Sequence, residues 1–484
     1  MVFNLIDILP ALPELLLASL ALVLVLVAAF GGEGTKNTRR VTRISLGGIL
    51  LALALIWFGA TNDETAFGGM HRADSFADYM KILVLLGTFA ALFMSITPLV
   101  KDDINKPEFS LLVLLALVGM MLMISANDLM SLYMAVELQS LPLYVVAAMR
   151  TKSLRSSEAG LKYFLLGALS SGLLLYGASL VYGFAGTTSF SGIASAVSSE
   201  QLPSAFIVGM VFMISGIAFK VSAAPFHMWT PDVYEGSPSP VTALFAIAPK
   251  VAAMGLMMRL TYSAFGSIAD QWSQVLVAVS IASMVIGALG AIMQNDIKRM
   301  MAYSSIAHMG YALAGLAAGT QQGALGVVIY MTGYIFMSAG SFAIILLMRR
   351  DGQAATKIGD LQGLSRTHPI LALGMMVMMF SMAGIPPLAG FFGKWYVFLA
   401  AVNAGLIPLA VTGVIMSVVG AFYYLRIIRL MYFEDANEPL DSDIPAANKI
   451  VLGVSIAVIL LFFVGLGQVL DSANIAANAL MAQL

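Results

Sequence analysis

The chain has 484 residues, of which 60% are hydrophobic and only 11% are charged, and its mean hydropathy is +0.91. Soluble domains carry about 25% charged residues, so this composition predicts an integral membrane protein. The net charge of -1 comes without a basic patch and argues against nucleic-acid binding, while the absence of cysteine excludes disulfides and cysteine-ligated iron–sulfur clusters.

Apolar stretches of about 20 residues predict about fourteen transmembrane helices and an all-α, polytopic fold. The stretches are continuous and lack the alternation of barrel strands. The first one has no Lys or Arg before Lys36, so we expect a retained helix rather than a signal peptide. The predicted spans are 9–30, 41–60, 78–99, 109–126, 128–149, 158–184, 204–226, 239–263, 272–294, 297–318, 322–348, 369–400, 405–432 and 449–470.

The basic residues predict the orientation of these spans. With the N-terminus outside, eighteen of the 25 lie in or beside cytoplasmic loops, and only Arg72, Lys81 and Arg259 lie outside. The other four fall within spans. We therefore expect both termini in the periplasm, or in the intermembrane space of an organelle.

Two interrupted spans suggest an internal repeat. Span seven breaks at 221–226 (VSAAPF) and span twelve at 384–393 (GIPPLAGFFG), where Pro removes amide donors. The breaks are five spans apart, so two five-helix units would insert upside down relative to each other, as in transporters whose broken helices line ion sites. A packing kink is the simpler alternative for each break alone. The predicted division of the single membrane domain 1–484 is 1–108 for three N-terminal helices, 109–263 and 264–433 for the inverted repeats, and 434–484 for a C-terminal helix.

Four ionisable residues inside apolar spans are the candidate functional residues: Glu137, Lys220, Lys250 and Lys394. A charge near the bilayer centre costs roughly 3 kcal/mol, so such residues are rare and usually functional. Glu137 shares a helical face with Tyr133 and Ser140, although a polar stripe of this kind also forms plain helix–helix hydrogen bonds.

The three lysines lie beside the interruptions or deep in a span. Lys220 precedes the first break, Lys250 follows Pro249 with apolar residues on both sides, and Lys394 follows the second break. The Gly-Lys pair at Lys394 does not belong to a phosphate-binding loop, because Trp395 replaces the required Ser or Thr. Together these residues predict a buried path for protons.

Two further residues have weaker signals. His308 lies mid-span beside Tyr303, Ser304 and Ser305, so a proton relay and a satisfied core histidine are both open interpretations. Lys162 lies four residues after Glu158, and an ion pair at the helix edge would explain it without any role in transport.

Several stretches carry a family resemblance: LMSLYMAVELQSLPLYVVAAMR, FKVSAAPFHMWTPDVYEGSPSPVTA, MQNDIKRMMAYSSIAHMGY and GIPPLAGFFGKW. Together they resemble the antiporter-like membrane subunits of respiratory complex I, the proton-pumping NADH-quinone oxidoreductase. The segment ELQSLPLYV is more particular to the subunit N family. The resemblance covers nearly the whole chain.

The resemblance implies fourteen helices with two inverted repeats and a role as a proton-translocating subunit of the enzyme. It implies that Glu137 pairs with Lys220 and that Lys250 passes protons towards Lys394. It also implies that His308 occupies the position of a bridging relay and that Lys162 is the lysine of span six next to the Glu–Lys pair. No cofactor is expected in this chain, since flavin and iron–sulfur clusters belong to partner subunits. The implied partners are other membrane-arm subunits, including antiporter-like ones, together with lipids and protons. The implied location is a bacterial inner membrane, or the mitochondrial inner membrane.

Two other functions stay open from the sequence. One is a subunit of a multisubunit sodium/proton antiporter, which the ELQSLPLYV segment disfavours. The other is a membrane scaffold without conduction, which leaves four buried charges without a role.

Overall fold

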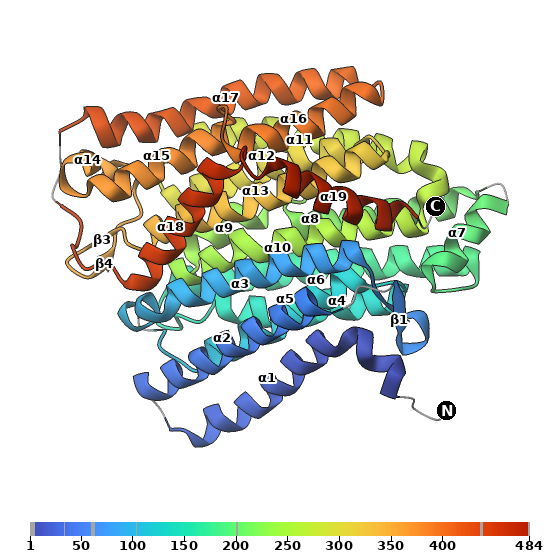
Figure 1. The fold of residues 1–484 in the computed structure, drawn as a ribbon, viewed down its shortest axis with the longest axis horizontal. Helices are drawn as coiled ribbons and strands as arrows, with labels where there is room; N and C mark the ends of the chain where they lie inside the picture. The colour runs from blue at the N-terminus through green and yellow to red at the C-terminus, as the bar shows by residue number, and fades with distance from the viewer. Residues whose placement is uncertain are drawn as a thin grey trace.

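The computed structural model describes residues 5–32, 34–59, 63–102, 104–199, 202–435 and 439–482. In this part of the chain the long helices run side by side along the molecule, from α1 and α2 at one edge to α17 at the other (Figure 1). The strands in it form two short antiparallel hairpins, β1 with β2 and β3 with β4. The predicted all-α fold is confirmed.

The N-terminal half contains the first spans and the first interrupted helix. Its elements are η1 (Leu5–Ala11), α1 (Leu12–Phe30), α2 (Thr35–Phe58), β1 (Glu64–Ala66), η2 (Phe67–Gly69), β2 (His71–Ala73), α3 (Ser75–Lys101), α4 (Glu108–Ser125), α5 (Leu129–Ala147), α6 (Leu154–Ala185), α7 (Phe190–Ser199), α8 (Ser204–Val221), α9 (Trp229–Gly236), α10 (Ser239–Arg259) and the π-helical turn η3 (Leu260–Ala264).

The C-terminal half contains the second interrupted helix and the bent C-terminal pair. Its elements are η4 (Gly266–Ile268), α11 (Ala269–Ile292), α12 (Ile297–Ala317), α13 (Gln321–Ile345), β3 (Arg349–Arg350), β4 (Gln353–Ala354), η5 (Ile358–Leu361), α14 (Leu364–Thr367), α15 (Pro369–Ala383), α16 (Ala389–Asn403), α17 (Ile407–Phe433), α18 (Ala446–Leu461) and α19 (Leu466–Met481).

Both predicted helix breaks are confirmed. Helix α8 ends at Val221 and the chain resumes a helix at Trp229 in α9, while α15 ends at Ala383 and α16 begins at Ala389. Each interruption contains a cis peptide bond, before Pro225 and before Pro387. Helices at matching positions of the two predicted repeats also pack on each other: α4 on α5 and α11 on α12, then α6 on α8 and α13 on α16.

The exact number of spans and the division into repeats stay predictions. Within the described residues, eleven helices are long and apolar enough to cross a membrane, or twelve if α18 and α19, which meet at 93°, form one span. Helix α12 is more polar, and the break divides α15 and α16 into shorter pieces. Counting α12 as one span and the α15–α16 pair as another would bring the twelve to the predicted fourteen.

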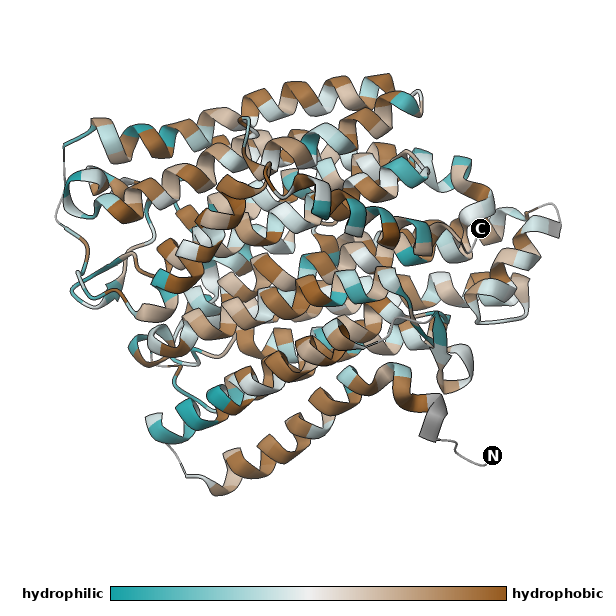
Figure 2. Cartoon of the chain, viewed as in Figure 1, coloured by the Kyte–Doolittle hydropathy of each residue, from teal (hydrophilic) through white to brown (hydrophobic). Residues whose placement is uncertain are grey.

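The two ends of the molecule differ in polarity. Helix α7, the β1–β2 hairpin and the end of α19 lie at one end, while α14, the β3–β4 hairpin and the start of α2 lie at the other (Figure 1). Hydrophilic residues gather at the start of α2 and at α14, and α1 is largely hydrophobic (Figure 2). The end with β3 and β4 carries the Arg-rich and Lys-rich loops that we expect in the cytoplasm.

Two basic residues that we had expected in outside loops lie inside helices instead. Lys81 of α3 pairs with Glu14 of α1, and Arg259 of α10 pairs with Asp74, and all four side chains are buried. A buried charge persists when an opposite charge compensates its lost hydration. The orientation therefore depends on the loop residues alone.

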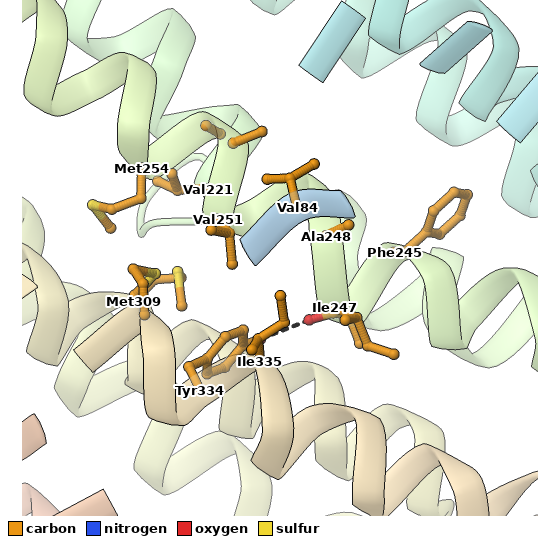
Figure 3. Packing of buried hydrophobic residues seen from close by; sticks show 14 of the residues in the cluster. Val84, Val221, Phe245, Ile247, Ala248, Val251, Met254, Met309, Tyr334 and Ile335 are labelled. Atoms are coloured by element: carbon orange, nitrogen blue, oxygen red, sulfur yellow. Dashed lines mark hydrogen bonds between the residues drawn. The ribbon is translucent and has the colours of Figure 1, made fainter. Parts of the chain in front are cut away.

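Helix α10 forms the centre of the core and is buried along its whole length. Its residues Phe245, Ile247 and Met254 lie in one packed cluster with Met309 of α12 and Tyr334 of α13 (Figure 3). Helices α3, α4, α8, α12 and α13 all contact α10. Any polar group on α10 is therefore surrounded by protein rather than lipid.

Cysteine labelling provides a test of orientation, because the chain has no native cysteine. Thr151, just before α6, and Ser198, in the last turn of α7, are both exposed, and the 32-residue helix α6 lies between them in the chain. A cysteine at Thr151 should react with a membrane-impermeant maleimide only from the cytoplasmic side, and one at Ser198 only from outside. A cysteine at the buried Thr88 is the control and should resist labelling from both sides. Labelling of Thr151→Cys and Ser198→Cys from the same side would contradict the orientation.

Candidate proton path

Helix α5 and the end of α8 hold the first buried lysine. Ser140 and Tyr144 lie three and seven residues after Glu137, so the three side chains share one face of α5. The Lys220 ammonium donates hydrogen bonds to Ser140 Oγ at 2.7 Å and to Tyr144 OH at 3.2 Å. Lys220 itself is buried at the last turn of α8, directly before the break.

The implied pairing of Glu137 with Lys220 is indirect in the structure. No ion pair within 4.0 Å joins these two described side chains, and the ammonium instead binds Ser140 and Tyr144. The two charges are still close enough to interact electrostatically. Glu137 Oε1 is buried without a hydrogen-bond partner in the protein. A buried carboxylate oxygen of this kind is a natural site for bound water.

Lys250 is the most enclosed of the lysines on this path, with 1% of its surface exposed. Its ammonium donates to Ser305 Oγ of α12 at 2.7 Å and lies 5.4 Å from the centre of the Tyr234 ring. An aromatic face stabilises a cation at this distance. Lys250 therefore connects α10 to α12 without any carboxylate beside it.

His308 continues the polar line along α12. Its Nδ1 lies 2.5 Å from Tyr330 OH of α13, and its Nε2 lies 3.0 Å from Tyr424 OH of α17. Tyr424 OH is also 2.5 Å from Ser304 Oγ. Both ring nitrogens thus have hydroxyl partners, and a hydroxyl can both donate and accept a hydrogen bond. Of the neighbours noted in the sequence, Ser304 contacts His308's partner Tyr424, and Ser305 binds Lys250.

The second helix break provides the surroundings of Lys394. Its ammonium donates to the carbonyl oxygens of Met382 and Ala383 at 3.0 and 2.9 Å, and to Ser417 Oγ at 2.6 Å. These carbonyls belong to the last turn of α15, where helix carbonyls have no donor of their own helix. The Lys394 ammonium also lies 4.9 Å from the centre of the Tyr311 ring. The interruption therefore creates the acceptors that hold this lysine.

Helix α12 links the two inner lysines. Ser305, His308 and Tyr311 follow one another at intervals of three residues and lie on one side of the helix. Ser305 binds Lys250, and Tyr311 faces Lys394. His308 lies between them and interacts electrostatically with both lysines. The structure thus places three buried groups of polar contacts, around Lys250, His308 and Lys394, along one side of α12. Lys220 lies on a neighbouring helix.

Lys162 lies apart from this buried line. Its side chain is 43% exposed and forms ion pairs of 2.8 Å with Glu158 and with Asp232. Arg299 binds the same Asp232 at 2.7 Å and Glu235 at 2.9 Å. These charges line an open cavity of about 170 Å³. The expected pair with Glu158 is confirmed, and Asp232 is a second partner that spacing along one helix does not indicate.

Ser140, Ser304 and Ser305 were noted in the sequence, but the other hydroxyl groups of the site were not predicted. Most of them are tyrosines on other helices, and a tyrosine in an apolar span fits a packed core equally well. Their common signal in the sequence is a polar group inside a membrane helix. This is weaker evidence for function than a charged residue at the same depth. The missed residues are Tyr144, Tyr234, Tyr311, Tyr330, Tyr424 and Ser417.

The fold and the network define a class: a polytopic helical membrane protein with two interrupted helices and a line of buried bases. Residues 126–420 match the family model described as NADH:quinone oxidoreductase/Mrp antiporter, TM. The chain is 55% identical to NADH-quinone oxidoreductase subunit N of Rhodospirillum rubrum over 97% of both chains. It is 50% identical to subunit N of Parvibaculum lavamentivorans over 98% of both.

Solved structures show the same fold. A chain of respiratory complex I from Thermus thermophilus is 31% identical, with a TM-score of 0.81 over 95% of this chain and 98% of that one. A chain of the Mrp complex from Dietzia sp. has a TM-score of 0.86 over 98% of both chains but only 22% identity, so it supports the fold alone. The chain belongs to the NADH-quinone oxidoreductase subunit N family.

Proposed function

We propose that this chain is a proton-translocating membrane-arm subunit of NADH-quinone oxidoreductase. The family relationship supports the assignment to this enzyme, and the buried polar contacts around Lys250, His308 and Lys394 support proton movement through the chain. These three groups carry the argument: each has a hydroxyl partner, and a buried ionisable group adds little to packing and is costly to bury. Electron transfer itself occurs in other subunits under this proposal, and this chain conducts the protons.

The mechanism is electrostatic. A charge change in a neighbouring membrane subunit perturbs Glu137 and Lys220, and Lys220 then biases the next lysine, Lys250. Protons pass from Lys250 to Ser305, then through His308 and the tyrosine hydroxyls bound to it, to Lys394 and then outward. Low polarity around the network strengthens each charge interaction, because less water screens it. Lys162, with Asp232 and Arg299, gathers protons at the cytoplasmic end.

The partners and location follow the same proposal. The chain assembles with other membrane-arm subunits, including antiporter-like ones, in the inner membrane of a bacterium or in the mitochondrial inner membrane, with both termini outside. Flavin and iron–sulfur clusters reside in partner subunits. Among the described residues, no group of three or more His, Asp or Glu side chains is arranged to hold a metal ion.

Purification of the tagged chain from its native membrane tests this assignment. We expect flavin and iron–sulfur subunits to co-purify, and the complex to acidify the outer side during NADH oxidation with quinone. Sodium-gradient-driven proton exchange, without NADH-dependent activity or redox partners, would instead support the antiporter. Membranes that pump normally without this chain would support a scaffold.

The indirect contact between Glu137 and Lys220 leads to a specific prediction. Replacing Glu137 by Gln removes the negative charge that acts on Lys220, and pumping should fall by about tenfold. This is less than the roughly 100-fold or more expected for a group that itself transfers the proton. Glu137→Asp retains the charge and should lose less. Glu108→Gln, at an exposed carboxylate, is the control and should pump normally. Wild-type pumping in assembled Glu137→Gln complex would remove Glu137 from the mechanism.

A further inference from the structure

A second group of ionisable side chains lies away from the central network, towards the end of the molecule with the β1–β2 hairpin. Lys81 of α3 and Glu14 of α1 form an ion pair of 2.6 Å, and their side chains are 1% and 3% exposed. Two charges at this depth are expensive to bury, and an apolar pair would pack as well. The proposed path from Lys220 to Lys394 makes no use of them.

Two neighbouring residues belong to the same group. His71 of β2 is buried, and its Nε2 has no hydrogen-bond partner in the protein. Burial, aided by the nearby Lys81 ammonium, lowers the pKa of His71 to about 4. The imidazole is therefore neutral at physiological pH and acts as a hydrogen-bonding group. Asp78 lies three residues before Lys81 on α3. We call Glu14, His71, Asp78 and Lys81 the outer cluster.

A cavity of about 460 Å³ lies beside the outer cluster. Lys81 and Asp78 are in its wall, and most of the remaining lining is apolar and comes from η1, α1 and the end of α2. A water molecule occupies about 30 Å³ of liquid, so the cavity has room for several. The unpartnered Nε2 of His71 provides a further polar atom in the cluster. The cluster thus combines titratable groups with space for water.

Asp78 also lines a second cavity, of about 490 Å³, which reaches α13. There Tyr79 OH lies 2.8 Å from Thr332 Oγ1. Thr332 is on the same helix as Tyr330 and Tyr334, and Tyr330 binds His308 of the central network. Asp78 is therefore placed between a cavity at the outer end of the molecule and the helix that borders the proposed path.

The other charges around the cluster are fixed. Arg259 holds Asp74 with two hydrogen bonds of 2.6 and 2.8 Å, and Arg72 lies 3.5 Å from Asp74 and 2.6 Å from Asp63. A guanidinium does not lose its proton in a protein, and a carboxylate paired with it stays ionised. Glu64 also lines the cavity beside α1, at an exposed position of β1. Among the buried groups that the structure describes here, the lysine and the carboxylates of the outer cluster are left to change charge.

We propose that the outer cluster is a proton-exchange site that opens to the outer side of the membrane through the cavity beside α1. The Lys81 ammonium gives its proton to the Asp78 carboxylate, directly or through cavity water, and Asp78 releases it to water outside. Glu14 stays a carboxylate and draws the next proton onto neutral Lys81. The direction of net flow rests on the proposed function, whereas the exchange of protons does not.

Chemical labelling tests the site without measuring transport. Dicyclohexylcarbodiimide reacts with protonated carboxyl groups in apolar surroundings. In the assembled complex, we expect the peptide with Asp78 to be labelled at least threefold more at pH 6 than at pH 9. Labelling of this peptide should vanish in Asp78→Asn. Asp63, which is exposed directly before β1, is the internal control and should stay unlabelled. An Asp78 peptide that is unlabelled throughout this pH range would overturn the proposal.

Transport by matched variants separates exchange from a structural role. Glu14→Gln with Lys81→Met removes both charges at once, so no single charge is left unpaired and assembly should survive. We expect this double variant and Asp78→Asn to pump at least threefold more slowly, with normal NADH oxidation by artificial acceptors. Asp63→Asn should pump normally. Wild-type pumping in the assembled double variant would show that the Glu14–Lys81 pair is structural. If that variant does not assemble, wild-type pumping by Asp78→Asn would overturn the exchange site.

One more comparison keeps the two proposals distinct. If Lys394→Met reduces pumping while both outer-cluster variants pump normally, the outer site fails and the proposed function stands. If Lys394→Met and the outer-cluster variants all pump normally, the proposed function fails as well.

Discussion

Replacing Lys250 by Met should abolish most proton pumping, with a decrease of roughly 100-fold or more, as for other proton-transfer groups. Lys250 is the link between α10 and the Ser305–His308 network, and methionine has a similar length but no proton to give. Ser305 Oγ keeps its hydrogen bond to the Ala302 carbonyl, so the substitution leaves no buried hydroxyl without a partner. The complex should therefore assemble, and vesicles that receive NADH and quinone provide the measurement.

Two further variants show whether pumping requires the proton of Lys250 or only its charge. Lys250→Arg keeps a positive charge but cannot release a proton near neutral pH, so it should also pump poorly if proton release matters. Lys36→Met removes an exposed lysine at the start of α2 and should pump normally. Normal pumping by Lys250→Arg together with loss in Lys250→Met would show that the charge alone is required and that Lys250 does not carry protons.

The helix interruptions could be predicted from the sequence because their cause is local. Proline removes an amide donor and glycine weakens the helix, so the breaks near Pro225 and Pro387 follow from a few adjacent residues. The buried lysines could be predicted for a similar reason, since a charge inside an apolar run stands out against its neighbours. In both cases the signal lies within about twenty residues of chain.

The partners of these lysines could not be predicted in the same way. Ser305 binds a lysine 55 residues earlier, and Tyr424 contacts a histidine 116 residues earlier. Such pairs depend on how whole helices pack. A tyrosine that binds a histidine looks the same in sequence as one that fills the core. The hydroxyl network therefore appears only in the assembled helices.

The outer residues Lys81 and Arg259 show the reverse problem. Both lie near the ends of apolar runs, where a long basic side chain usually extends to the membrane surface. Their acidic partners Glu14 and Asp74 are 67 and 185 residues away in the chain, and these contacts bury them instead. Charge counts along the chain predict an orientation of the helices but not the depth of an individual side chain.

Lys394→Met is the second substitution with a large expected effect, and its control is Ser417→Ala. Ser417 provides one of three acceptors for the Lys394 ammonium, and the carbonyls of Met382 and Ala383 remain in the Ala variant. Ser417→Ala should therefore retain most of the pumping rate. A comparable loss in both variants would contradict this and show that the Ser417 hydroxyl is required together with the lysine.

Lys394→Met removes the last base of the proposed path, where the α15–α16 break supplies its two carbonyl acceptors. Each carbonyl that loses its donor costs about 1–3 kcal/mol, but the substitution also removes a buried charge, so we expect assembly to survive. NADH oxidation by artificial acceptors occurs in other subunits and should be unchanged. Quinone-coupled turnover and pumping should fall by roughly 100-fold or more, because protons that reach His308 have no base on the outward side. If the complex fails to assemble, Lys394 is structural, and if the number of protons per electron stays at the wild-type value, Lys394 lies off the proton path.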